Sequence, residues 1–453
     1  MSAPFPPGSG AKRGGGKGAV ARGTDSTGQT GSTQDGHLAS PFSPLARPIA
    51  WTVVEPTQDA SALIREYLLL GLRFDRIESG YVDSFTGDPA LRQQVDNEPA
   101  PDPAELARQA DRLRAALPGG LDAARADYLR VHLRALACAG RKFAGQQIGF
   151  VEEVRDYFDV DIAKGDPDRY RQAHTRLDAA LGGTGPLADR MAAHRRADEI
   201  PPARLEACIH AFSSALRDRV RADYPLPDTE TITYEVVTDK PWSGFNYYLG
   251  DYRSTVAVNA DLKQLMSNLP RLVAHESYPG HHTEHCRKEA GLVHRHGHDE
   301  QTIFLVNTPQ CLMAEGLADL ALYAAIGPGW GGWAAEIYAD LGLRFDGEKA
   351  EAVAEASAAL ADVRQDAALM LHDEHRDPDE VAAFLQRWLL VDDTRARQML
   401  RFLSSPLWRA YTSTYVEGYR LLRGWLDGRP AGMALTERFG RLLDEPLIPS
   451  ALR

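Results

Sequence analysis

The sequence predicts a mainly α-helical protein with two lobes and a small β element beside a candidate metal-binding helix. After residue 44, most of the chain carries apolar residues at helical spacing, with Pro and Gly clusters between the periodic segments. Strand-like patterns rich in β-branched residues are confined to 231–238 and 253–259. No internal repeat of roughly 20–50 residues is evident. We expect an N-terminal helical lobe over residues 45–230 and a C-terminal lobe over 231–453 that carries the candidate site.

The predicted helices follow in order along the chain. The first covers 61–73, and an Ala-, Leu- and Arg-rich stretch over 103–145 forms a helical region that Pro118-Gly119-Gly120 interrupts. Asp102 stands where an N-cap of this region belongs. Further helices are expected over 167–181, 202–222, 266–290, 310–325, 347–372, 378–390 and 392–426.

The first 44 residues have a different composition from the rest. Gly, Ser, Thr and Pro dominate them, with four basic residues and no apolar stretch that would serve as the core of a secretory signal. Such a segment cannot bury enough apolar surface to offset the entropy of folding. We expect residues 1–44 to form a disordered tail.

Charge and cysteine usage exclude several classes of partner. The 453 residues carry a formal net charge of −12, which disfavours nucleic acid or an anionic membrane as a partner. No apolar run approaches the ~18 residues of a membrane span. The four cysteines are scattered and form no C-x-x-C pair, which is typical of reduced thiols in a cytoplasmic protein. We expect a cytoplasmic protein that binds neither nucleic acid nor membrane.

Residues 275–282, which read HESYPGHH, form the most informative stretch of the chain. Two imidazoles beside a carboxylate that is free of the metal are what a hydrolytic zinc site requires. In the common H-E-x-x-H motif the two histidines stand four residues apart on one helix face. Here that position is Pro279, so the motif is interrupted at the second ligand.

Two arrangements would restore a second histidine ligand beside His275. If Pro279 and Gly280 bulge the helix as a two-residue insertion, His281 takes the place of the second histidine. If the helix continues without a break, His282 lies on the same face as His275 but about 10 Å further along the axis. That is too far for two bonds of about 2 Å to one ion. We therefore favour His281 over His282, with His285 as a third choice.

A second candidate segment follows later in the chain. Residues 313–323 are typical of a helix, and Glu315 and Asp319 stand four apart and so on one face of it. One of these carboxylates can complete a site of two histidines and one carboxylate. The other can accept a hydrogen bond from a ligand histidine.

These segments resemble a known family. HESYPGHH, the helix that begins Glu315-Gly316-Leu317-Ala318, and Tyr415-Val416-Glu417-Gly418 are similar to the DUF885 proteins, which are in turn similar to gluzincin-type zinc metallopeptidases. The resemblance extends from about residue 45 to the C-terminus. It implies a helical, metallopeptidase-like fold, in which residues 231–453 form the catalytic lobe. The chain departs from the family pattern at Leu317, where an aromatic residue is usual.

The resemblance also implies roles for individual residues. It implies Zn²⁺ as the cofactor, His275, His281 and Glu315 as its ligands, and Glu276 as the general base. The match at Tyr415 makes this phenol the first choice for stabilising a developing oxyanion, ahead of Tyr411, Tyr419 and Arg409. The strand at 254–259 is expected to line the cleft and to pair with the substrate backbone.

The resulting hypothesis is a zinc-dependent hydrolase that cleaves a peptide or other amide bond of a small substrate. Three alternatives stay open at this point. The same ligands could serve a non-peptide amide of a small metabolite. Pro279 could have abolished metal binding and left a binding protein. Two histidines and a carboxylate also suit Fe(II) with open coordination positions.

Overall fold

The computed structural model describes residues 58–118, 121–238 and 244–453. Helices make up 64% of the structure and strands 8%, which confirms the predicted mainly α class. The expected tail over residues 1–44 lies outside the described residues. Residues 58–453 belong to one compact unit with a shared apolar core, and the expected lobe boundary at residue 230 stays a prediction. Among the described residues, no helix is both long enough and apolar enough to cross a membrane.

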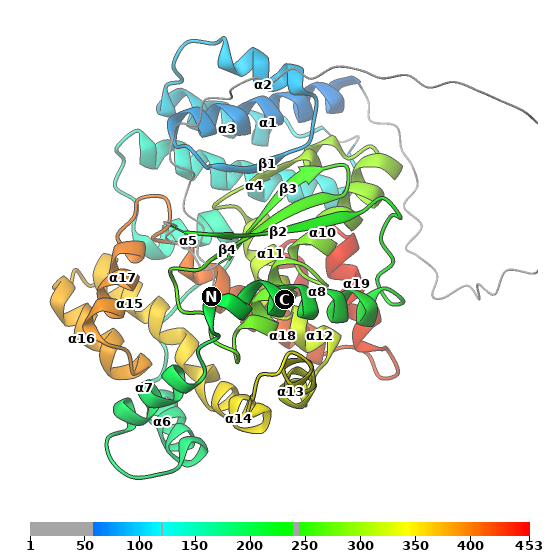
Figure 1. The fold of residues 1–453 in the computed structure, drawn as a ribbon. Coiled ribbons are helices and arrows are strands. Elements are labelled where there is room, and N and C mark those ends of the chain that lie inside the picture. The colour runs from blue at the N-terminus through cyan, green and yellow to red at the C-terminus, as the bar shows by residue number, and fades with distance from the viewer. Residues whose placement is uncertain (1–57, 119–120, 239–243) are drawn as a thin grey trace, which may run out of the picture. The chain divides into compact units, whose positions relative to one another are not determined.

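Aspartate caps begin several of the first helices. Side-chain oxygens of Asp88, Asp102 and Asp122 accept hydrogen bonds from backbone N–H groups at three helix starts, which supplies partners that the helix itself cannot provide. The expected region 103–145 is therefore two helices, separated in the segment that contains Pro118. The first helices are α1 (Gln58–Ile77), α2 (Pro89–Asp96), α3 (Pro103–Ala115), α4 (Ala123–Phe143) and α5 (Phe150–Phe158). Helices α1 to α4 lie together at the top of Figure 1.

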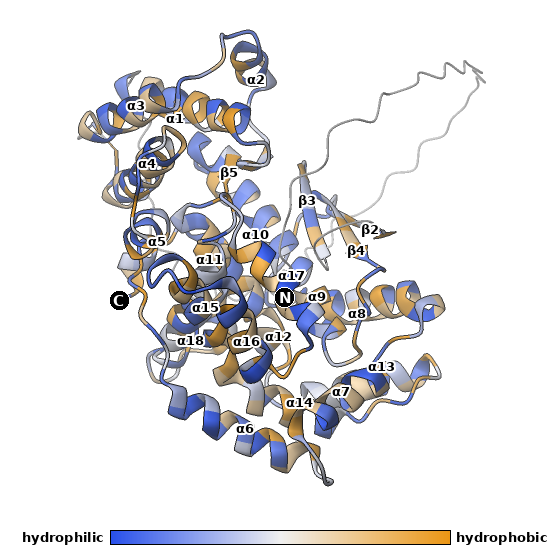
Figure 2. Ribbon diagram, turned by 90° about the vertical axis from the view of Figure 1, so that its left-hand side faces the viewer, coloured by the Kyte–Doolittle hydropathy of each residue, from blue (hydrophilic) through white to orange (hydrophobic). Residues whose placement is uncertain are grey.

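The later helices complete the core. Figure 2 shows hydrophobic and hydrophilic residues alternating in bands along most of them, as in amphipathic helices. The expected helix 167–181 coincides with α6, and the expected helix 378–390 ends one residue later than α16. These helices are α6 (Pro167–Leu181), α7 (Leu187–Ala197), η1 (Pro202–Arg204), α8 (Leu205–Val220), α13 (Trp330–Asp340), α14 (Gly347–Ser357), η4 (Ala358–Ala361), α15 (Asp362–His372), α16 (Pro378–Leu389), α17 (Asp393–Leu403), α18 (Tyr419–Asp427), α19 (Leu435–Asp444) and η6 (Pro449–Leu452).

Two small sheets lie within the helices. In the larger sheet, β4 (Arg253–Asn259) is central, with β2 (Thr231–Val237) parallel on one side and β3 (Gly244–Gly250) antiparallel on the other. In the smaller sheet, β1 (Val82–Phe85) pairs antiparallel with β5 (Ile303–Leu305). The two strands expected from the sequence are therefore confirmed. The expectation missed β1, β3 and β5, which are short or rich in aromatic residues.

Several long predicted helices are divided. The expected helix 266–290 is α9 (Leu269–Glu276), a turn and α10 (His281–Lys288), followed by the π-helical segment η2 (Glu289–Arg295) and the short helix η3 (Asp299–Thr302). The expected helix 310–325 is α11 (Pro309–Asp319) and α12 (Ala321–Ala325). The expected helix 392–426 ends as α17 at Leu403 and resumes as the π-helical η5 (Thr414–Gly418) and α18.

Candidate metal centre

A break between two helices places His281 beside His275. Helix α9 ends at Glu276, and α10 begins at His281 after a turn in which the Gly280 N–H donates to the Ala274 carbonyl oxygen at 3.0 Å. A Cβ atom at Gly280 would lie 2.0 Å from the His275 carbonyl oxygen, so only glycine fits there. The prediction of one continuous helix with a bulge is therefore wrong. The chain ends one helix and starts another, and the two imidazole centroids lie 4.7 Å apart.

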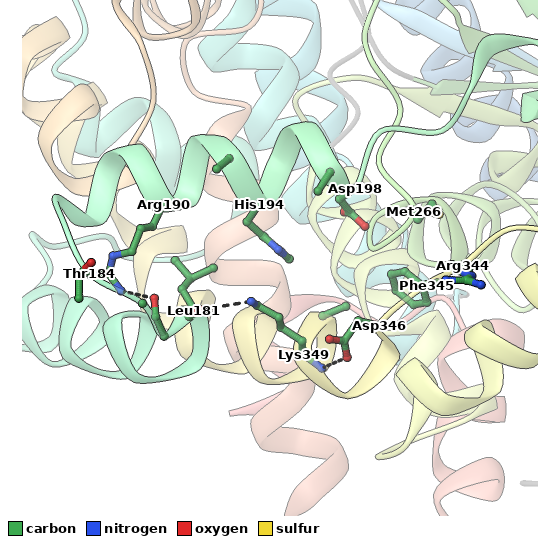
Figure 3. A pocket seen from close by; sticks show the side chains of 15 residues that line it. Leu181, Thr184, Arg190, His194, Asp198, Met266, Arg344, Phe345, Asp346 and Lys349 are labelled. Carbon is green, nitrogen blue, oxygen red and sulfur yellow. Dashed lines mark hydrogen bonds between the residues drawn. The ribbon is translucent and has the colours of Figure 1, made fainter.

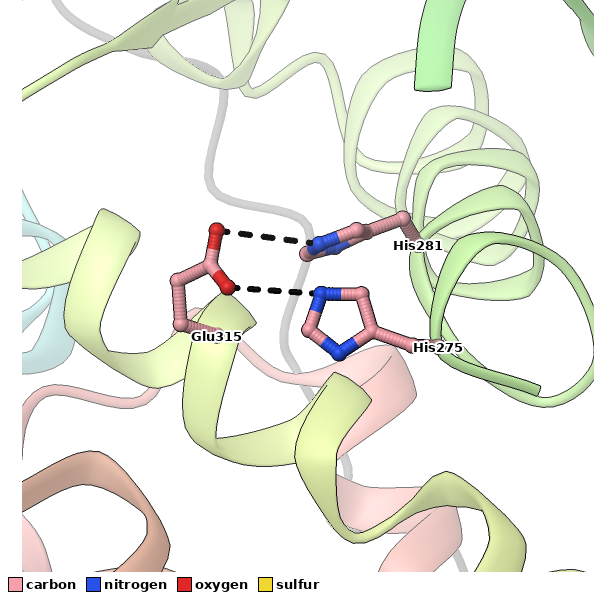
Figure 4. Close-up of side chains that lie close together, drawn as sticks. All are labelled: His275, His281 and Glu315. Atoms are coloured by element: carbon pink, nitrogen blue, oxygen red, sulfur yellow. Dashed lines mark ion pairs between the residues drawn. The ribbon is translucent and has the colours of Figure 1, made fainter. Parts of the chain in front are cut away.

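Three side chains from three helices converge at this break. Glu315 on α11 faces both imidazoles: its Oε2 lies 3.4 Å from His275 Nε2, and its Oε1 lies 3.8 Å from His281 Nε2. One ligand atom from each residue lies within 4.8 Å of the others. Figure 4 shows the Glu315 carboxylate facing both imidazoles. The structure thus brings together the three residues that the resemblance implied as ligands. We refer to His275, His281 and Glu315 as the metal cluster.

Further groups hold the three candidate ligands in orientation. Asp319 Oδ1 lies 3.2 Å from His275 Nδ1, as expected from its spacing to Glu315 on α11. The Tyr411 hydroxyl donates to Glu315 Oε1 at 2.7 Å. Glu284 Oε2 lies 3.9 Å from His281 Nδ1, while its Oε1 accepts from Lys288 Nζ at 2.6 Å. The sequence analysis missed Glu284, although its position three residues after His281 on one helix was a usable signal.

The electrostatics of the metal cluster favour a cation. Burial opposes protonation of His275, but the carboxylates of Asp319 and Glu315 overcome it and raise the pKa of His275 to about 10. Burial is likewise outweighed at His281, whose pKa is raised by Glu284 and Glu315. Burial alone would raise the pKa of Asp319, but the imidazole of His275 outweighs burial and lowers this pKa. Positive charge is therefore stabilised at this point of the protein.

The donor set fits a zinc ion. Glu315 Oε2 is buried and has no hydrogen-bond partner in the described structure, although it lies 3.4 Å from His275 Nε2. An unsatisfied buried carboxylate oxygen is costly unless a cation or donor completes its environment. Two imidazole nitrogens and one carboxylate oxygen are the protein ligands found in many catalytic zinc sites. The cluster therefore has both the composition and the unmet valence that zinc would satisfy.

His282 belongs to a different, buried network. Its Nδ1 lies 2.8 Å from Ser254 Oγ, and its Nε2 lies 2.9 Å from Glu230 Oε2. The Tyr278 hydroxyl donates to the same carboxylate oxygen at 3.0 Å, and Arg217 forms an ion pair with Glu230. His282 is fully buried and does not line the cavity at the metal cluster. Both of its ring nitrogens have protein partners, so His282 is not available as a ligand.

A cavity adjoins the metal cluster and contains Glu276. The Asn246 amide donates to the Glu276 carbonyl oxygen at 2.6 Å, which links β3 to the end of α9. A Cβ atom at Gly244 would lie 3.3 Å from Glu276 Oε1 and 2.9 Å from the Leu272 side chain, so glycine leaves room for the carboxylate. The cavity is lined by Asp83, Gly244, Phe245, Asn246, His275, Glu276, His281, His285, Phe304, Val306, Glu315, Tyr411 and Tyr415. Leu317 is buried in the core and does not line this cavity.

Two phenols reach the cavity because η5 packs closely on α11. A Cβ atom at Gly316 would lie 2.5 Å from the Gly418 backbone, so the paired glycines allow the two segments to touch. This contact places Tyr415 beside Tyr411, with ring centroids 5.6 Å apart. Burial, and then the charge of Glu315, raises the pKa of Tyr415 well above the ordinary value, which keeps its hydroxyl protonated. The Tyr411 hydroxyl donates to Glu315, and the role of Tyr415 as the oxyanion donor stays a prediction.

Asp83 and His285 are further titratable groups of the cavity. The sequence analysis gave Asp83 no role. Burial raises the pKa of Asp83 to about 7; the imidazole of His281 opposes this shift, while Glu315 and Glu276 add to it. Burial lowers the pKa of His285 to about 3, and its ring stacks on Tyr248 at 4.5 Å. His285, the third choice as ligand, is not part of the metal cluster.

The strand that borders the cavity is β3 rather than β4. The expectation that residues 254–259 would pair with a substrate is wrong, because β4 already has β2 and β3 hydrogen-bonded on its two sides. The cavity is instead lined by Gly244, Phe245 and Asn246 of β3, the edge strand. Sequence alone does not reveal the order of strands in a sheet.

A second, larger cavity lies between α6, α7 and α14 (Figure 3). Its volume is about 700 Å³, and it contains none of the metal-cluster residues. Three of its charged residues have protein partners: Arg190 pairs with Asp178, Lys349 donates to the Leu181 carbonyl oxygen at 3.2 Å, and Asp198 accepts from Ser267. The candidate ligands and the candidate general base all line the smaller cavity instead.

Comparisons with known proteins do not identify the chain. No protein-family model matches it, and no curated protein matches it. A crystal structure of a "putative lipoprotein" from Colwellia psychrerythraea is similar over 80% of this chain and 68% of that chain, with 11% sequence identity and a TM-score of 0.49. A likeness of this extent carries no argument about function.

Proposed function

We propose that this protein is a zinc-dependent hydrolase of peptide or other amide bonds in a small substrate. The observation that carries the proposal is the metal cluster, with Glu276 in the adjoining cavity and a buried oxygen of Glu315 that has no hydrogen-bond partner in the described structure. The resemblance to the DUF885 proteins, and through them to gluzincin metallopeptidases, supports the same chemistry. His275, His281 and Glu315 would hold the ion.

Different residues of the cavity serve different steps of amide hydrolysis. A bound zinc ion supplies Lewis-acid chemistry, since it polarises a carbonyl group and acidifies water. Glu276 accepts the proton of the attacking water and delivers it to the leaving nitrogen. The Tyr415 hydroxyl donates a hydrogen bond to the carbonyl oxygen as negative charge develops on it. Asp319 and Tyr411 contact the candidate ligands His275 and Glu315 at hydrogen-bond distance and keep them in place.

The roles of the cluster and of Glu276 can be tested separately. Metal content is measured by mass spectrometry on purified wild-type protein and on the His275→Ala, His281→Ala and Glu315→Ala variants. We expect about one zinc ion per chain in the wild type and none in these variants. The exposed His294 supplies a matched control, since His294→Ala should keep the ion. Iron in place of zinc would direct attention to oxygen-dependent chemistry instead.

Glu276→Gln tests the general base. This variant should retain zinc but lose at least about 100-fold in kcat on a panel of peptide and non-peptide amides, because the amide cannot accept the proton. Glu348→Gln, at an exposed position of α14, is the control and should leave the rate unchanged. Amide hydrolysis that survives in zinc-loaded Glu276→Gln protein contradicts the proposal. If the protein hydrolyses only the non-peptide amides of the panel, the proposed substrate class narrows to amides of small metabolites.

A further inference from the structure

The cavity beside the metal cluster contains hydrogen-bond acceptors that the proposed hydrolysis does not use. Its described lining includes no Lys and no Arg side chain. Besides Glu276 and Glu315, the lining includes the carboxylate of Asp83 and the side-chain amide of Asn246. These two residues come from β1 and β3, which lie in contact.

Asn246 has one unsatisfied end. Its Nδ2 donates to the Glu276 carbonyl oxygen at 2.6 Å, and this bond fixes which way the amide is turned. Its Oδ1 is buried and has no hydrogen-bond partner in the described structure, and the residue is only 7% exposed. A buried acceptor of this kind costs about 1–3 kcal/mol if nothing donates to it. A donor from outside the described chain, either a water molecule or a ligand N–H group, would satisfy this acceptor.

Asp83 reaches the cavity through an irregularity in β1. Val82 pairs with Leu305 and Ser84 pairs with Phe304, so Asp83 is the extra residue of a β-bulge with no partner opposite. Bulges next to functional sites redirect a side chain that regular pairing would point elsewhere. Among the described residues, no hydrogen bond or ion pair engages the Asp83 carboxylate; the charged groups that act on it are His281, Glu315 and Glu276.

The two open acceptors define what can bind beside the metal cluster. A primary ammonium offers three N–H donors and a positive charge, which matches one carboxylate and one amide oxygen. A substrate carboxylate would instead meet Asp83, Glu276 and Glu315 with no Lys or Arg in the described lining to pair with it. The cavity therefore favours an amine and disfavours the free C-terminus of a peptide.

We propose that Asp83 and Asn246 bind the free α-amino group of a peptide, so that the enzyme is an aminopeptidase. The inference rests on the proposed hydrolase function and specifies its substrate class. The α-nitrogen of an amino acid lies about 2.5 Å from its own carbonyl carbon. An amine held by Asp83 therefore puts the first peptide bond in the cavity that Glu276 and His281 share. Water adds to that carbonyl, the C–N bond breaks, and the released amine takes the proton.

Binding can be measured without turnover. Zinc-loaded Glu276→Gln protein is titrated by calorimetry with Leu-Gly-amide and with N-acetyl-Leu-Gly-amide, which differ only at the α-nitrogen. We expect the free amine to bind at least about tenfold tighter, a difference typical of a charge-assisted hydrogen bond. Adding Asp83→Asn should reduce this ratio to near one while the zinc content is unchanged. Asp96→Asn, at an exposed position of α2, should leave the ratio as it was.

Several outcomes overturn the inference. It fails if the two peptides bind equally, or if Asp83→Asn weakens both alike. N-acetyl-Lys-amide tests a side-chain amine, and tight binding of this ligand assigns the site to a cationic side chain instead. If Asp83→Asn does not fold, the wild-type rates on free and acetylated peptides decide: equal kcat/KM rejects the aminopeptidase.

The hydrolase and the amine site can fail independently. Selective amine binding without hydrolysis of any amide removes the proposed function and keeps the amine site. Hydrolysis of free and acetylated peptides at equal rates keeps the hydrolase and removes the amine site.

Discussion

His281 and His282 are adjacent in sequence, yet they belong to two different regions of the molecule. His281 lies at the cavity, where its Nε2 is 3.8 Å from Glu315 Oε1, and the other oxygen of that carboxylate has no hydrogen-bond partner in the described structure. His282 is fully buried, and both of its ring nitrogens contact protein groups. The two imidazoles start the same helix, α10, and point in different directions from it.

The contrast separates a site from a structural support. Both histidines contact carboxylates, so a nearby Glu does not distinguish the two roles. What differs is the completeness of the hydrogen bonding: the Ser254–His282–Glu230 network is satisfied at His282, whereas the metal cluster leaves Glu315 Oε2 open. A buried acceptor without a hydrogen-bond partner beside a cavity indicates a missing ligand. Complete hydrogen bonding in the core indicates a role in stability.

The largest expected difference between the two regions is in metal binding. His281→Ala should abolish retention of zinc through purification, because it removes one of three protein ligands. His282→Ala should keep about one zinc ion per chain, because this residue does not contact the metal cluster. Metal content by mass spectrometry measures both. Loss of zinc in both variants, with both still folded by circular dichroism, would contradict the assignment.

The reverse difference is expected in stability. His282→Ala should lower the free energy of unfolding by about 1–3 kcal/mol, because the buried carboxylate of Glu230 loses one hydrogen-bond partner while Tyr278 and Arg217 remain. His281→Ala should cost less in metal-free protein. Urea unfolding of the metal-free forms gives both values. The double variant Glu230→Gln/His282→Ala checks the cause, since its loss should be smaller than the sum of the single losses.

The carboxylates that contact the two histidines sharpen the comparison. Asp319→Asn should weaken zinc binding by about 10–100-fold, because the carboxylate orients the imidazole of His275 and increases its basicity. Glu230→Gln removes the corresponding carboxylate from His282 and should leave zinc affinity unchanged. Competition with a chromophoric chelator measures both affinities. Equal losses in the two variants would mean that the regions are coupled.

The comparison extends to the pH dependence of metal-free protein. The pKa of His275 is about 10 in the folded protein and about 6.5 in an unfolded chain, so the folded state binds the extra proton between these values. The stability from this group is fully present below about pH 6.5 and is lost as the pH rises towards 10. Zinc should remove this slope, because the ligand nitrogen no longer takes a proton. Urea unfolding of wild type and His275→Gln at several pH values between 6 and 10 isolates the contribution.

Local patterns predicted much of the helical structure. The expected helix at 167–181 and the N-cap at Asp102 are confirmed because periodic apolar residues and capping side chains act within a few residues of the chain. The expected helix over 266–290 was too long. Pro279 was recognised as a disturbance, but whether a chain bulges or starts a new helix depends on what packs around it.

The candidate site was predictable in part for the same reason. His275, Glu276 and His281 lie in one short segment, so spacing and ligand chemistry were enough to favour His281 over His282. Glu284 was within reach of the same reasoning and was missed. Asp83 and Asn246 were not predictable, because their roles come from the pairing of β1 with β5 and from the position of β3 at the edge of its sheet.

The sequence by itself determined the mainly helical class, the caps and breaks of many helices, and the types of residue available to bind a metal. Only the tertiary structure decided that Glu315 faces both imidazoles, that His282 is occupied by Ser254 and Glu230, and that a bulge turns Asp83 towards the cavity. The physical reason is range. Helical periodicity and capping act over neighbouring residues, whereas the partners of a buried polar group are selected when distant segments pack together.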